Sequence, residues 1–153
     1  MRFTHYLLIL TLLFGISSIA HSQKLTQEDY CTNGLCPLDS LSKAYLLFGQ
    51  PLEFEWIQGE DDSTQHISFD GIEIYGDENG SIIRYEIRSN KFRTSRSISV
   101  GDSASAVKIV YGEPKKVGWT NDLIYGSETL FYAFELKNDR VNRIIVGFYH
   151  HLD

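Results

Sequence analysis

An internal repeat constrains this chain more than any other feature. Residues 38–56 (LDSLSKAYLLFGQPLEFEW) align without a gap with residues 101–119 (GDSASAVKIVYGEPKKVGW), at an offset of 63 positions. The identical pairs are Asp39/Asp102, Ser40/Ser103, Ser42/Ser105, Gly49/Gly112, Pro51/Pro114 and Trp56/Trp119. Because repeated sequence units share a structural unit, we expect both segments to fold alike.

Each copy has the pattern of a helix, a turn and a strand. Apolar residues at 41, 44, 47 and 48, and again at 104, 107, 110 and 111, have the spacing of one buried helix face. Asp39 and Asp102 are suited to cap the helix starts by accepting a backbone N–H. A left-handed glycine followed by a proline should end each helix. These residues are Gly49 and Pro51 in the first copy, and Gly112 and Pro114 in the second.

Further strands follow in each copy. The segments IYGDENGSIIRYEI (74–87) and FELKNDRVNRIIV (134–146) each have the pattern of two strands around a tight turn. Asp70-Gly71, between two alternating segments, is a two-residue hairpin signal. The sequence therefore predicts antiparallel pairing between neighbours in the chain.

The predicted architecture is an α+β fold of two tandem units, each a short helix followed by three or four antiparallel strands. The units span 37–90 and 98–153 and are joined by a basic connector, residues 91–97. A unit of about 55 residues is marginal alone, because a small domain buries too little apolar surface. We therefore expect the units to share one core or a continuous sheet.

The second copy also carries a family resemblance. The segment GDSASAVKIVYGEP (101–114) resembles a motif of exported bacterial proteins, in which a Gly-Asp-Ser helix start precedes Val and Gly-x-Pro. It is similar to the repeat unit of the beta-lactamase-inhibitory-protein (BLIP) and BamE (SmpA/OmlA)-like superfamily. The resemblance implies helices on an antiparallel sheet and a role in protein binding. No functional residue is carried over, since this chain lacks the lipidation cysteine of BamE-type proteins and has shorter units than the inhibitors.

The first 22 residues have the pattern of a secretory signal peptide. Arg2 supplies a positive start, residues 6–16 form an apolar run, and small residues lead to cleavage after Ser22, or alternatively after Ala20. An uncleaved anchor is disfavoured, because the apolar run is too short to span a bilayer. We expect an exported protein, periplasmic or secreted, that does not insert into a membrane after cleavage.

The net charge disfavours two classes of partner. The chain has 14 Lys+Arg and 20 Asp+Glu, and cleavage would remove only Arg2 from this balance. Nucleic acids and anionic membrane surfaces bind basic faces. We therefore expect a protein partner and no nucleic acid.

Both cysteines lie in the N-terminal segment, residues 23–36. Cys31 and Cys36 are close in sequence, and in an oxidising compartment such a pair forms a disulfide. This bond is expected to fasten the segment to the first helix. A redox or metal site is the alternative, disfavoured because no second ligand pair lies nearby.

The sequence has no pattern of catalytic or cofactor-binding residues. No serine lies in a Gly-x-Ser-x-Gly elbow, and no glycine-rich phosphate loop is present. Three histidines lie outside the leader, His66, His150 and His151, without the spacing of a metal site. We expect no enzyme activity, no cofactor and no metal.

The two tryptophans have two interpretations. Trp is enriched at binding hot spots, so Trp56 and Trp119 could contact a partner. Their equivalent places in the two copies favour a repeated packing role instead.

Acidic residues gather in the first copy. Between Lys43 and Arg84 the sequence has nine Asp or Glu residues and no Lys or Arg. The first copy is also longer after its tryptophan, and this extra stretch contains Glu60, Asp61 and Asp62. They form either a solvated acidic face or a prong that docks into a basic cleft of a partner.

Together these features favour a non-catalytic exported protein-binding module. The preferred function is an inhibitor or immunity-type protein that blocks a toxin or hydrolase in the periplasm. The alternatives are an envelope assembly or structural accessory protein like BamE, and a small-ligand-binding protein or enzyme. The sequence does not indicate the oligomeric state.

Overall fold

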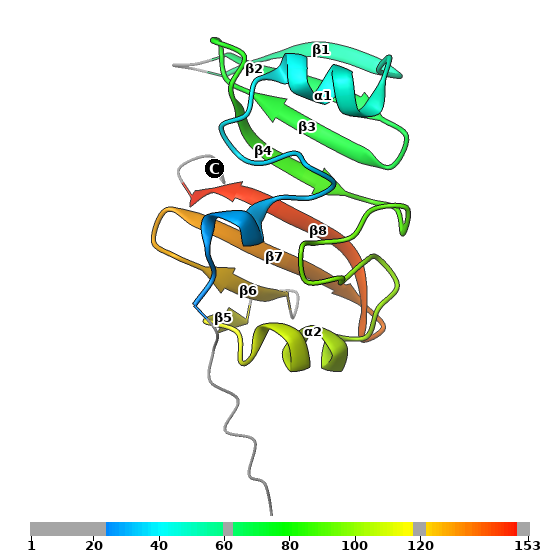
Figure 1. The fold of residues 1–153 in the computed structure, drawn as a ribbon, viewed down its shortest axis with the longest axis vertical. Coiled ribbons are helices and arrows are strands. Elements are labelled where there is room, and N and C mark those ends of the chain that lie inside the picture. The colour runs from blue at the N-terminus through cyan, green and yellow to red at the C-terminus, as the bar shows by residue number, and fades with distance from the viewer. Residues whose placement is uncertain (1–23, 60–62, 118–121, 150–153) are drawn as a thin grey trace, which may run out of the picture.

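The structure, a computed structural model, describes residues 24–59, 63–117 and 122–149, so the expected leader lies outside it. The described chain forms one antiparallel sheet that carries short helical elements (Figure 1). The helical elements are η1 (Gln27–Tyr30), α1 (Leu41–Phe48) and α2 (Ala104–Tyr111). The strands are β1 (Glu53–Gln58), β2 (Ser63–Phe69), β3 (Ile72–Gly76), β4 (Ile82–Ile87), β5 (Lys116–Val117), β6 (Leu123–Gly126), β7 (Leu130–Lys137) and β8 (Arg140–Phe148).

The predicted fold class, α+β with two tandem helix-plus-strand units, is wrong. The eight strands form a single sheet in the order β1-β2-β3-β4-β8-β7-β6-β5, which makes this a mostly-sheet fold. The helices α1 and α2 have only eight residues each, too few to set the architecture. The reason lies in the centre of the sheet, where β4 pairs with β8 and joins the strands of both halves of the chain in one sheet.

The two helices occupy positions related by the repeat offset. Ser40 and Ser103 are their N-caps, and Gly49 and Gly112 follow their last residues at φ values of +82° and +81°. A side chain is strained in this left-handed region, which is why glycine stands there. The prediction that these glycines end the helices is confirmed.

The repeated aspartates do not cap the helices as predicted. Asp39 and Asp102 each lie one residue before the N-cap, and their carboxylates accept the backbone N–H three residues upstream. The donors are Cys36, at 2.7 Å, and Ser99, at 2.8 Å. In α2 the cap is the serine that follows, since Ser103 Oγ accepts a first-turn N–H at 3.2 Å. The aspartates therefore fix the turn that leads into each helix.

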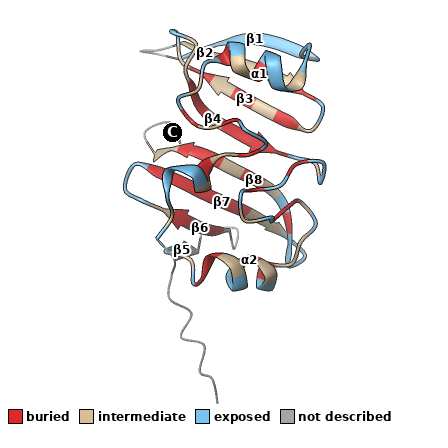
Figure 2. Ribbon diagram, in the orientation of Figure 1, coloured by how far each residue is buried: buried red, intermediate tan, exposed pale blue. Residues whose placement is uncertain are grey.

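One face of the sheet is covered and forms the core. η1 and both helices contact this face, where one row of paired residues crosses from β2 to β6 (Figure 2). Every residue of that row is at most 3 % exposed. The row is Ile67, Ile74, Tyr85, Val146, Tyr132 and Tyr125. Because the row is continuous, the hydrophobic core extends across the line where β4 pairs with β8, which we call the β4–β8 seam.

The opposite face carries a buried carboxylate at that seam. Glu86 in β4 is fully buried and accepts hydrogen bonds from Arg88 at 2.7 Å, from Arg143 of β8 at 2.8 Å, and from Arg84. Arg143 also donates to Glu135 of β7 at 2.6 Å. Burial alone would raise the pKa of Glu86, but the three guanidinium groups outweigh it and lower the pKa.

The N-terminal segment crosses the seam on the covered face (Figure 1). Tyr85 of β4 donates its hydroxyl to the Tyr30 carbonyl at 2.6 Å, and Tyr132 of β7 donates to the Asp29 carbonyl. The Asp29 carboxylate binds Arg96, with Arg96 Nε at 2.7 Å, in the connection that leads to α2. The segment therefore contacts both halves of the sheet.

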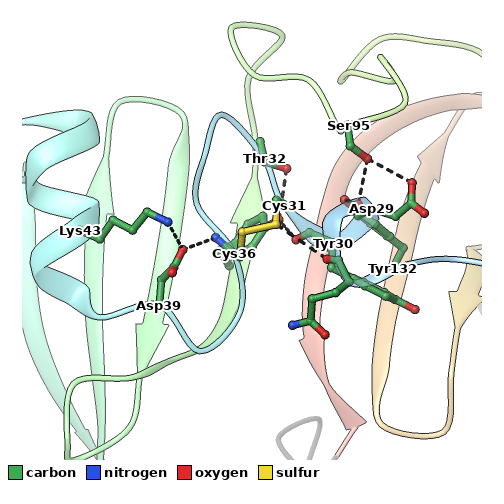
Figure 3. The surroundings of a disulfide bond; sticks show 11 residues. Asp29, Tyr30, Cys31, Thr32, Cys36, Asp39, Lys43, Ser95 and Tyr132 are labelled. Carbon is green, nitrogen blue, oxygen red and sulfur yellow. Dashed lines mark hydrogen bonds and ion pairs between the residues drawn. A yellow bond between two sulfur atoms is a disulfide. The ribbon is translucent and has the colours of Figure 1, made fainter.

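The predicted disulfide between Cys31 and Cys36 is confirmed (Figure 3). It closes a small hairpin in which Thr32 and Leu35 exchange backbone hydrogen bonds of 2.8 and 2.9 Å. Asp39 lies immediately beyond it and bridges the Cys36 N–H and Lys43 of α1, whose Nζ is 2.8 Å away. This chain of contacts ties the disulfide hairpin to the first helix.

Replacing both cysteines by serine should lower the free energy of unfolding by about 2 kcal/mol. The cause is the entropy that the unfolded chain regains when the short loop opens. Urea unfolding followed by circular dichroism measures the change. An unchanged midpoint would contradict a stabilising role.

Asp29 should contribute stability that is lost in acid. The hydrogen bond from Arg96 is the largest cause of its lowered pKa, about 2 in the folded protein. A lowered pKa stabilises the fold above the unfolded value of about 3.9, and this contribution disappears as the pH falls toward 2.

The variant Asp29→Asn should therefore lose about 2 kcal/mol at pH 7, with the difference from wild type shrinking below about pH 4. The exposed neighbour variant Glu28→Gln is the matched control and should leave stability unchanged. A difference between wild type and Asp29→Asn that is constant from pH 7 to pH 2 would contradict the ion pair as its cause.

Candidate functional site

The edge strand β1 is the strongest candidate for a binding surface. It is the first strand of the sheet order, so only one of its edges is paired among the described residues, with β2. All six of its residues are exposed, in contrast to the buried central strands (Figure 2). Soluble proteins protect such edges, because an unpaired row of N–H and C=O groups accepts a further strand.

Three apolar side chains follow one another at alternate positions along this edge. Leu52 is 70 % exposed, and Phe54 and Trp56 are each 48 % exposed. Phe54 and Trp56 contact each other edge to face, with ring centroids 6.2 Å apart. We call Leu52, Phe54 and Trp56 the β1 apolar row.

The position of α1 explains why this row stays open. Tyr45 and Phe48 of α1 pack on Phe69 of β2, with ring centroids 6.0 and 5.6 Å apart. Leu41 lies over Gly76 of β3, where an added Cβ would be 2.7 Å from Leu41 Cδ1. The helix therefore covers β2 and β3 and leaves the corresponding face of β1 to solvent.

Polar contacts on the other face hold β1 in place. His66 of β2 lies between two carboxylates, with Nδ1 2.8 Å from Glu55 of β1 and Nε2 2.6 Å from Glu73 of β3. Its ring stacks on Tyr75 at 4.8 Å, and Arg84 lies over that tyrosine at 4.4 Å. This chain of contacts fixes the strand that carries the apolar row.

The charge near β1 is acidic. Glu53 and Glu55 lie on the strand itself, and the Glu55 side chain is 62 % exposed. Basic side chains of the same half are bound to acids: Lys43 to Asp39, Lys91 to Asp70, and Arg84 and Arg88 to Glu86. The edge therefore offers aromatic surface flanked by negative charge.

The packing role predicted for Trp56 is wrong, because its side chain is half exposed. The alternation of apolar and polar residues predicted a strand, which is confirmed. The alternation does not indicate whether a helix covers that strand. Trp119 and the predicted prong, Glu60, Asp61 and Asp62, lie outside the described residues.

Two serines each lie three residues before a lysine in the sequence. Ser40 and Lys43, and Ser105 and Lys108, have the Ser-x-x-Lys spacing found in some acyl-transferring enzymes. In the first pair, Lys43 Nζ binds Asp39, and Ser40 Oγ bonds to another serine hydroxyl. Activation of Ser40 would need a base within hydrogen-bond reach, and these contacts supply none.

The Glu86 cluster is a second concentration of charge that the sequence did not reveal. Its three arginines and two glutamates bind one another, so the structure explains them as a buried ionic contact between strands. In the sequence, Arg84 and Arg143 hold matching places in the segments 74–87 and 134–146, which is the signal that could have indicated the cluster.

No metal or membrane-spanning element emerges from the described ranges. Within residues 24–59, 63–117 and 122–149, no three His, Cys, Asp or Glu side chains are placed to hold a metal ion. None of the helices in that part of the chain is long and apolar enough to cross a membrane.

Comparisons with known proteins give a likeness of fold. No family model and no curated protein matches the sequence. The crystal structure of YfeY from Escherichia coli, described as uncharacterized, is similar with a TM-score of 0.52 at 17 % identity, over 78 % of this chain and 97 % of that one. YjgB from Bacillus subtilis, a DUF4309 family protein, has a TM-score of 0.44 at 10 % identity, over 71 % and 78 %.

Both likenesses are narrow in scope. The likeness to YfeY concerns the fold alone, and the score for YjgB is too low to support any conclusion. The resemblance to BLIP and BamE stays a prediction from the repeat motif.

Proposed function

We propose that this protein is a non-catalytic exported module that binds another protein through β1. The observation that carries the proposal is the β1 apolar row on a sheet edge that is free among the described residues. Aromatic side chains exposed in a row are typical of binding hot spots. An inhibitor or immunity-type protein, which blocks a toxin or hydrolase in the periplasm, is the preferred form of this function.

The edge suggests how the partner binds. An extended segment can add to β1 as a further antiparallel strand, with backbone hydrogen bonds for affinity and alternate side chains for specificity. Its apolar residues would pack on Phe54 and Trp56, and its basic residues would face Glu53 and Glu55 on the other face. A second copy of this chain fits less well, because each copy brings further acidic residues to the shared edge.

Export is supported by two independent features. The disulfide between Cys31 and Cys36 is typical of an oxidising compartment, and the first 22 residues have the pattern of a secretory leader. Both agree with a periplasmic or secreted site of action.

An envelope accessory function is the second candidate. The same edge could bind an outer-membrane component stably, as the BamE resemblance implies. The partner's location separates the two candidates: a soluble toxin or hydrolase supports the inhibitor, and an outer-membrane protein supports the accessory role.

Substituting serine for both Phe54 and Trp56 should weaken partner binding at least about tenfold, because hot-spot aromatics dominate interface energies. Tagged wild type and variant are compared in capture from envelope extract of the source organism, and the captured protein is then titrated. The control is Ile109→Ser, an apolar residue of α2 that is 84 % exposed. Equal capture by the double variant and the wild type would rule out β1 as the binding edge.

The predicted acidic prong gives a separate test. Neutralising Glu60, Asp61 and Asp62 as Gln and Asn should slow association, and the wild-type association rate should fall as salt rises. The control Glu128→Gln removes a charge from the other half of the sequence. Stopped-flow fluorescence of Trp56 in a Trp119→Phe background measures the rate, since the chain has two tryptophans. If neither the salt concentration nor the neutralising substitutions change the association rate, the prong is rejected. The β1 edge is tested separately, by the Phe54 and Trp56 variants.

A further inference from the structure

A pocket lies between the N-terminal segment, the end of α2 and the end of β6, far from β1 in the strand order. Its volume is about 310 Å³, at the lower end of the range for small-molecule sites. It is lined by Lys24, Leu25, Tyr30, Tyr111, Lys115, Tyr125, Gly126 and Ser127. These residues come from segments that are distant in sequence, so the pocket exists only in the folded chain.

The inner wall of the pocket is formed by three buried tyrosines. Tyr30, Tyr111 and Tyr125 are each at most 4 % exposed, and Tyr111 and Tyr125 have ring centroids 5.4 Å apart. Their hydroxyls donate to groups of the protein itself, at 3.3 Å to the Leu130 carbonyl, 2.9 Å to Thr94 and 3.0 Å to the Gly112 carbonyl. These donors are therefore already used, and the three rings form a nearly closed floor beside the partly exposed Leu25.

The phenols stay neutral under ordinary conditions. Burial raises the pKa of Tyr111 to about 12, and it also raises the pKa of Tyr30 and Tyr125. The phenols therefore add no negative charge to the pocket, and the acids that act on them electrostatically are Glu113, on Tyr125, and Asp29, on Tyr30.

The mouth of the pocket is cationic. Lys24 and Lys115 are both exposed, and neither forms an ion pair with another described residue. The lysines of the first half behave differently, because Lys43 and Lys91 are bound to Asp39 and Asp70. On an acidic protein, two lysines at the opening of one aromatic pocket are a local positive site.

From this juxtaposition we infer that the pocket binds a small amphipathic anion, with its apolar body on Leu25 over the tyrosine floor and a carboxylate or phosphate at Lys24 and Lys115. The site goes beyond the proposed protein-binding function and uses none of the residues of β1. The apolar body supplies burial and the lysines supply orientation, the usual division of roles in a ligand pocket.

The probe for the test is 2-naphthoate, with its neutral counterpart 2-naphthalenemethanol and inorganic phosphate as the other arms. Calorimetry or ligand-observed NMR should give saturable 2-naphthoate binding with a Kd of about 1 mM or below. The neutral alcohol should bind more weakly, and phosphate should bind weakest, since each lacks one of the two contacts. In amide spectra, the signals of Gly126 and Ser127 should shift, while those of β1 should not.

The double variant Lys24→Gln/Lys115→Gln should weaken 2-naphthoate binding by about fivefold or more, because both charges at the mouth are removed. Lys108→Gln/Lys137→Gln is the matched control, with the same change in net charge and no lining residue. All four lysines are outside the core, so both variants should fold. Absence of saturable binding up to about 10 mM, or equal weakening by the control pair, would overturn the inference.

Discussion

The pairing of β4 with β8 is the interaction on which the rest of this structure depends. It joins strands from the two halves of the chain in one sheet, and different contacts stabilise the two faces of this strand pair. On the covered face Tyr85 packs in the core row and bonds to the N-terminal segment. On the other face Glu86 binds arginines from both strands. A buried carboxylate without these partners would destabilise the fold, so separating β4 from β8 is unfavourable in free energy.

This central seam places the two candidate sites at opposite ends of the sheet. β1 ends the sheet order on one side, and the tyrosine pocket lies near β6 and α2 on the other. The N-terminal segment runs between them, from the pocket residue Lys24 to the disulfide hairpin before α1 (Figure 1). One sheet therefore carries an acidic aromatic edge and a pocket with two lysines, and the two sites share no residue.

Local chemistry made much of the secondary structure predictable. Gly49 and Gly112 end their helices, the turns at Asp70-Gly71 and Asn138-Asp139 connect strands, and Cys31 bonds to Cys36. In each case neighbouring residues determine the backbone, so a short segment of sequence suffices.

Features that depend on distant contacts were not predictable. The predicted fold class was wrong because the repeat motif gives a helix and a strand equal weight, whereas the helices have eight residues each and the strands form one sheet through the β4–β8 pair. The packing role predicted for Trp56 rested on its place in the repeat, and that place does not indicate whether a helix covers the strand. The sequence predicts Asp39 and Asp102 as helix caps, since aspartate and serine are almost equal as N-caps, but the register of the turn gives this position to Ser40 and Ser103. The charged cluster around Glu86 needs residues 57 positions apart to meet.

The most direct test of the central claim is hydrogen exchange of the variant Glu86→Gln, measured by mass spectrometry beside the wild type. If the buried carboxylate couples the two halves, protection should fall together in β3 and β7, by about 3 kcal/mol in opening free energy. A loss of protection confined to β3 and β4, with β7 unchanged, would contradict it and show that the halves open independently.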